Sequence, residues 1–247
     1  MKDCCNDRSA QNPARRHWLG AVAGAGGAMA AGLALLPGNA AAVSLSQQDR
    51  DAMTPDQVVD MLREGNARFR GGAMHSHDFL AQKRATVSGQ YPAAVILSCI
   101  DSRAPAEIIF DAGIGDIFGA RIAGNVSTPD LLGSMEFACA VAGARLVLVM
   151  GHTGCGAIAG AINGVQLGNL TGLLARIEPA VAAAEHAGER SGHSQEFVDA
   201  VAQANVLHTI ATIRRDSPLL AGLEQQGKIR IAGAMYDLGN GLVTFLG

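Results

Sequence analysis

Continuously apolar runs alternate with helical patterns along most of the chain, which predicts an α/β protein. The runs "AAVILS" and "RLVLVMG" indicate strands buried on both faces, because a strand with one solvent-exposed face would alternate apolar and polar positions. Further strands are predicted at "DIFGARI", "IRIAGAMYD" and "GLVTFLG", the last two joined by a hairpin-like turn. Helical patterns are found at 54–72, 78–87, 127–144 and 170–226, with a break near "EHAGERSGHSQE". This order predicts a mostly parallel β-sheet flanked by helices, with an N-terminal helical arm.

Residues 1–42 depart from this pattern. Arg15 and Arg16 precede an uncharged stretch at 19–36 that is rich in alanine and glycine, and an Ala-x-Ala site follows it. Such a segment resembles a twin-arginine export signal, although an uncleaved apolar run of this length is also just able to anchor a chain in a membrane. We therefore expect a signal peptide at 1–42, a catalytic domain at 43–247 and periplasmic localisation, with membrane contact only through export or an uncleaved anchor.

Composition narrows the classes of function. The 247 residues are 49% hydrophobic and 17% charged, which is enough for one sizeable core. A formal net charge of -3 leaves no basic excess of the kind that nucleic-acid binders carry, so a nucleic-acid partner is not expected. Beyond residue 42 the chain has three cysteines, an odd number that argues against a disulfide framework. Of these, Cys139 lies in an apolar helical pattern and is expected to be a buried small side chain.

Metal-binding side chains stand at the ends of two predicted strands. Cys99 closes one strand, and His152 and Cys155 follow another. The carboxyl ends of parallel strands meet at one edge of a sheet, so we expect the three side chains to face one crevice. Two thiolates and an imidazole suit zinc, and three protein ligands leave the fourth position open, as is typical of catalytic sites. The sequence therefore predicts one Zn²⁺ per chain.

Asp101 and Arg103, directly after Cys99, have a predicted role at this metal. Asp101 can accept a hydrogen bond from a zinc-bound hydroxide, and Arg103 can orient Asp101 through a bidentate ion pair. Simpler explanations remain open for each residue: a core cysteine, a loop histidine, a surface ion pair, or a nucleophilic Cys155 with His152 as its base. The occurrence of all five residues at the ends of two strands favours the metal site over these alternatives.

These five residues resemble the motifs of the β-class carbonic anhydrases, Cys-x-Asp-x-Arg followed some fifty residues later by His-x-x-Cys. The similarity also includes "RIAGN" at 121–125 and "YDLGNGLV" at 236–243. The resemblance implies the β-carbonic anhydrase fold and a zinc lyase activity, the reversible hydration of carbon dioxide to bicarbonate and a proton. It also implies a homodimer or homotetramer as the working assembly.

Substrate-binding residues follow from the same resemblance. Gln90 matches a glutamine that hydrogen-bonds a substrate oxygen, Phe118 matches an apolar wall, and Gly156 is expected in the same small pocket near the dimer interface. Phe137 stands where many plant-like members have a tyrosine. Close relatives of the fold hydrolyse carbonyl sulfide or carbon disulfide, and a non-catalytic sensor or a thiol redox protein also remains open from the sequence.

Overall fold

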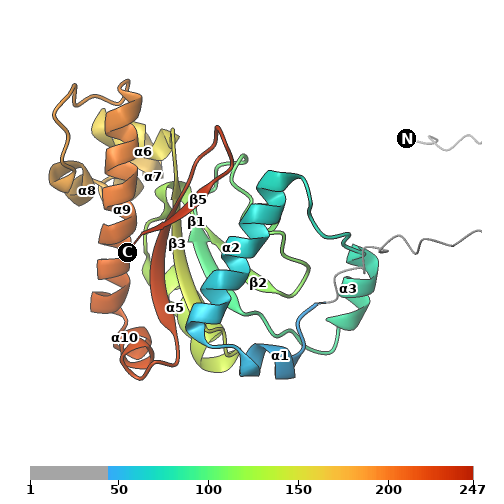
Figure 1. Cartoon of the computed structure of the whole chain (residues 1–247). Coiled ribbons are helices and arrows are strands. Elements are labelled where there is room, and N and C mark those ends of the chain that lie inside the picture. Colours follow the sequence, from blue (N-terminus) through green and yellow to red (C-terminus); the bar gives the residue numbers. More distant parts are fainter. Residues whose placement is uncertain (1–43, 247) are drawn as a thin grey trace, which may run out of the picture. The chain divides into compact units, whose positions relative to one another are not determined.

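The computed structural model describes residues 44–246 (Figure 1). The predicted export signal, its cleavage site and the domain boundary at residue 42 lie outside the described residues. Within 44–246, no helix has the length and apolar character needed to cross a membrane.

The described residues form a five-stranded sheet with the strand order β2-β1-β3-β4-β5. The first four strands run parallel to one another, and β5 runs antiparallel to β4. The strands are β1 (Ala94–Ser98), β2 (Ile117–Arg121), β3 (Leu146–His152), β4 (Arg230–Tyr236) and β5 (Val243–Leu246). The predicted mostly parallel sheet, with its closing hairpin, is confirmed.

Helices cover both faces of this sheet, which explains why every residue of β1 and β3 is buried. On one face, Ile96 packs in a cluster with apolar side chains of α2 (Pro55–Gly71). On the other face, Val95 packs in a cluster with side chains of α9 (Gln195–Asp216). Figure 1 shows α2 and α9 on opposite sides of the strands. Successive side chains along a strand therefore point to opposite faces and pack into two separate hydrophobic cores.

Helix boundaries follow the sequence signals where those signals were strong. Helix α2 begins after Thr54, whose side chain accepts a hydrogen bond from the N–H of Gln57, and the Gln57 side chain accepts one from the N–H of Thr54. The predicted break in the segment 170–226 separates α8 from α9. The other helical elements are α1 (Gln47–Ala52), α3 (Phe79–Ala85), α4 (Ala106–Ile109), η1 (Ala123–Asn125), α5 (Pro129–Glu136), η2 (Phe137–Val141), α6 (Gly156–Ile162), α7 (Gly168–Leu174), α8 (Glu178–Ala183) and α10 (Pro218–Gln225).

A buried carboxylate fastens α2 to the loop that follows α4. Asp111 accepts hydrogen bonds from Arg68 Nε at 2.6 Å, His77 Nε2 at 2.8 Å and the backbone N–H of His75 at 3.1 Å. Burial alone would raise the pKa of Asp111, but these three partners outweigh it and lower that pKa below its ordinary value. An ionised Asp111 therefore holds α2 to the loop that follows α4.

Candidate metal centre

Cys99, His152 and Cys155 come together at the carboxyl end of the sheet. Cys99 follows β1, His152 is the last residue of β3, and Cys155 immediately precedes α6. Because β1 and β3 are adjacent and parallel, their ends lie side by side. The three ligand atoms lie within 4.8 Å of one another, all three residues are buried, and the two sulfurs are 3.9 Å apart. The cluster therefore has the compactness that a single metal ion requires.

The hydrogen bonding of His152 leaves one ring nitrogen available as a ligand. Its Nδ1 lies 2.9 Å from the carbonyl oxygen of Thr153, and since a carbonyl only accepts, Nδ1 carries the proton. The other nitrogen, Nε2, is buried and has no hydrogen-bond partner. A buried, unpaired nitrogen is costly unless another group uses its lone pair. This nitrogen and the two thiols form a donor set that fits zinc.

The two thiols are not equivalent. Hydrogen bonding with Cys155 is the main cause of a lowered pKa at Cys99, and His152 and the N–H of Gly124 act in the same direction. The Gly124 nitrogen lies 3.4 Å from the Cys99 sulfur. Hydrogen bonding with Cys99, together with burial, raises the pKa of Cys155. The surroundings therefore favour negative charge on the Cys99 sulfur, as metal binding requires.

Asp101 lies beside these three residues and forms a bidentate ion pair with Arg103. The Arg103 guanidinium donates to both carboxylate oxygens, from Nε to Oδ1 at 3.0 Å and from Nη2 to Oδ2 at 2.8 Å. Oδ2 also lies 3.9 Å from His152 Nε2. The hydrogen bonds from Arg103 hold the pKa of Asp101 well below its usual range, so the carboxylate stays charged beside the ligands.

Arg121, at the end of β2, fixes the backbone of the same loop, and the sequence reasoning assigned it no role. Its Nε donates to the carbonyl oxygen of Cys99 at 3.0 Å, and its Nη2 donates to the carbonyl oxygen of Asp101 at 2.6 Å. The available signal was its place at the end of a predicted strand next to the one that ends at Cys99. Its contacts were not deducible, since they depend on strand register.

Helix α9 supports both ligand loops from behind the sheet. Asn205, fully buried, donates from Nδ2 to the carbonyl oxygen of Gly124 at 2.7 Å. Asp199 accepts a hydrogen bond from the N–H of Gly154 at 2.8 Å, between His152 and Cys155. These two polar residues of α9 therefore brace the segment that contacts the Cys99 sulfur and the turn that carries the other two ligands. Nothing local in the sequence distinguishes them from ordinary helix residues.

The expected substrate-binding residues lie in other places of the single chain. Gln90 is exposed and lines a hollow with residues 86–89, whereas Phe118 lines another hollow together with Phe137. Neither hollow is lined by a residue of the metal cluster. Gly156 starts α6 and is exposed, and a Cβ placed on it would meet no atom within 4 Å. Of these residues, only Gly156 adjoins a ligand in the sequence.

Comparisons with known proteins agree with this geometry. Residues 94–243 match the family model described as carbonic anhydrase. The chain is 38% identical over 186 residues to "Carbonic anhydrase 2" of Mycobacterium tuberculosis, covering 73% of this chain and 87% of that protein. It is 32% identical over 196 residues to "Carbonic anhydrase" of Pseudomonas aeruginosa, covering 74% of this chain and 85% of the relative.

Solved structures show the same fold. A tetrameric β-carbonic anhydrase from Sordaria macrospora aligns with a TM-score of 0.60 at 24% identity, covering 78% of this chain and 98% of that one. The β-carbonic anhydrase of Coccomyxa aligns with a TM-score of 0.60 at 19% identity, covering 77% and 82%. The chain therefore belongs to the β-class carbonic anhydrase family and is a carbonic anhydrase.

Proposed function

We propose that this enzyme binds one Zn²⁺ through Cys99, His152 and Cys155 and catalyses the reversible hydration of carbon dioxide to bicarbonate and a proton. The observation that carries the proposal is the compact cluster of two thiols and a histidine whose Nε2 is buried and unpaired. Bound zinc would lower the pKa of a water molecule and so supply a nucleophile near neutral pH. Three protein ligands leave the open position that such chemistry requires.

Asp101 and Arg103 are proposed to orient the reacting water. The carboxylate of Asp101 has only acceptor oxygens, so a water beside it donates one hydrogen bond to Asp101 and turns its lone pairs elsewhere. Arg103 fixes the plane of that carboxylate through two hydrogen bonds, and Arg121 fixes its backbone. A water held in one orientation avoids part of the entropic cost of reaching the transition state.

We also propose that the working assembly is a homodimer or homotetramer. Large apolar side chains are exposed on the described part of the chain, among them Ile100 at 60%, Ile108 at 52% and Phe137 at 51%. Contiguous exposed apolar surface often marks an interface, and these side chains are proposed to be buried between subunits. Gln90 and Phe118 are proposed to contact carbon dioxide or bicarbonate in that assembly. Light scattering of the purified protein measures its mass, and a fully active monomer would contradict this proposal.

Export through the twin-arginine pathway is proposed from residues 1–42. This pathway transports folded proteins, which would allow the metal to be loaded before export. Mass spectrometry of periplasmic fractions should detect a chain that lacks the first 42 residues. A double variant with lysine in place of both Arg15 and Arg16 should remain in the cytoplasm. Full-length protein in the membrane fraction would instead indicate an uncleaved anchor.

The first test is stopped-flow carbon dioxide hydration by the purified full chain between pH 6.5 and 9, with zinc measured on the same sample. We expect about one zinc per chain and a rate that disappears on chelation and returns with zinc. Cys155→Ser should lose zinc and activity together. Cys139→Ser is the matched control, because Cys139 is also a buried thiol but lies outside the cluster.

Two outcomes would contradict the proposed reaction. Stoichiometric zinc with no hydration at any pH would exclude carbon dioxide, and the same sample would then be assayed with carbonyl sulfide and carbon disulfide. A disulfide between Cys99 and Cys155 without bound zinc would favour a thiol redox protein.

A further inference from the structure

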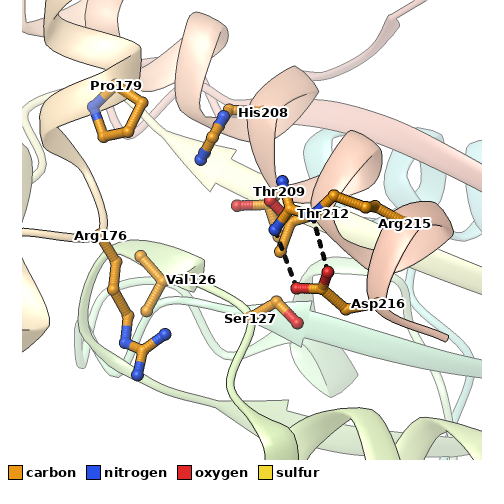
Figure 2. Close-up of a pocket in the computed structure, with 9 residues that line it drawn as sticks. All are labelled: Val126, Ser127, Arg176, Pro179, His208, Thr209, Thr212, Arg215 and Asp216. Atoms are coloured by element: carbon orange, nitrogen blue, oxygen red, sulfur yellow. Dashed lines mark hydrogen bonds and ion pairs between the residues drawn. The ribbon is translucent and has the colours of Figure 1, made fainter.

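A further polar hollow lies beside the C-terminal half of α9 (Figure 2). One wall is the last turns of α9, another is the segment that contains Ser127, and a third is the turn before α8 that contains Arg176. The cavity has a volume of about 270 Å³, and none of its lining residues belongs to the metal cluster. No role in hydration requires it.

Cationic and hydrogen-bond-donating side chains dominate the lining. Arg176, His208 and Arg215 line the cavity, against one carboxylate, Asp216. Asp216 is occupied by Arg215, with Nε–Oδ1 at 2.7 Å and Nη2–Oδ2 at 2.9 Å (Figure 2). The guanidinium of Arg176 makes no hydrogen bond or ion pair with any described residue. One full positive charge is therefore left uncompensated at the cavity.

Two buried hydroxyls of the lining also lack partners. Ser127 is only 6% exposed, and its Oγ has no hydrogen bond within the described chain. Thr212 Oγ1 is likewise buried and unpaired. They belong to different walls of the cavity, one to the segment before α5 and one to α9. Buried hydroxyls without partners destabilise a protein, so their persistence calls for an explanation.

We propose that this pocket binds a phosphate group, either as inorganic phosphate or as the phosphate of a small monoester. Phosphate oxygens would accept hydrogen bonds from Ser127 and Thr212, and Arg176 would offset the negative charge. His208 supplies a further ring nitrogen that can donate. The volume lies just below the usual range for small-molecule sites, which suits a phosphate with few carbon atoms better than a nucleotide.

Isothermal titration calorimetry of the zinc-loaded full chain at low ionic strength tests this proposal, with inorganic phosphate and glycerol 3-phosphate as separate titrants. We expect saturable binding of one phosphate group per chain, weakened at least tenfold by Ser127→Ala and by Arg176→Gln. Arg84→Gln is the matched control, since Arg84 is exposed on α3 and does not line the pocket. Tighter binding of the ester would assign the site to a phosphate monoester, and equal binding would assign it to the free ion.

The stability of Ser127→Ala separates ligand binding from a structural role. A buried, unpaired hydroxyl does not stabilise the fold, so this variant should unfold without phosphate at the same temperature as wild type or above it. Phosphate should raise the unfolding temperature of wild type but raise that of Ser127→Ala less. The proposal would be overturned if wild type did not bind phosphate, if all variants bound it equally, or if binding were lost when zinc is removed.

Discussion

Asp101→Asn is the change that tests the proposed chemistry most directly. The amide keeps the size of the side chain but removes its charge, and it places either an amide nitrogen or a weaker acceptor against the donors of Arg103. The backbone should stay in place, because Arg121 holds the carbonyl oxygens of Cys99 and Asp101. The variant therefore isolates the loss of an oriented carboxylate beside the cluster.

The expected magnitude separates activity from stability. Outer groups that orient metal ligands are worth about 10–100-fold, and a positioned proton acceptor is worth about 10²–10⁴-fold. We expect a loss of about 10²-fold in kcat/KM, or about 2.7 kcal/mol of transition-state free energy. The Arg103 side chain is 60% exposed, so its ion pair contributes little to folding. The unfolding temperature should change by no more than about 4 °C.

Stopped-flow hydration and zinc content measured on one sample check this prediction. Arg103→Lys keeps the charge but loses the bidentate geometry, so it should lie between wild type and Asp101→Asn. Asp60→Asn removes an exposed ion pair with Arg63 on α2 and serves as the control. A rate for Asp101→Asn within about threefold of wild type, at full zinc occupancy, would refute the orienting role.

Three further changes test the architecture. Asn205→Ala leaves the Gly124 carbonyl without its partner, so chelator competition should show zinc binding weakened about 10–100-fold. Asp111 has a lowered pKa, so its stabilising contribution is present above the ordinary value near 3.8 and is lost as pH falls below it. Asp111→Asn should therefore be less stable than wild type at pH 7. Between pH 2 and 6, the free energy of unfolding measured in urea should depend less on pH in this variant than in wild type. Gly65→Ala should destabilise by about 1–3 kcal/mol despite better helix propensity, because the new Cβ would collide with the Phe110 carbonyl; unchanged calorimetric stability would contradict that packing.

Local sequence signals were sufficient for the larger elements. The apolar runs that became β1 and β3 were predicted as strands buried on both faces, because they are short and lack the alternation of a strand with one solvent-exposed face. The Thr54 capping box predicted the start of α2. The short helices α1, α4 and α6 were missed, because elements of four to seven residues depend on tertiary contacts more than on propensity.

The proximity of Cys99, His152 and Cys155 was predictable for a similar reason. Parallel strands place their carboxyl ends at one edge, so residues that follow two neighbouring strands must lie near each other whatever the details of packing. Cys99 and His152 satisfy that condition, and the short turn "HTGC" keeps Cys155 close to His152.

The sequence by itself thus determined the strands, the sheet type and the residues that could hold a metal. Only the tertiary structure decided which groups support them: Arg121 on the loop backbone, and Asp199 and Asn205 on α9. It also decided that Gln90 and Phe118 lie in hollows of their own, and that Ser127 and Arg176 line one cavity. Periodicity and spacing report which residues share a strand or a helix face, whereas contacts between distant segments depend on how whole layers pack, which no local pattern encodes.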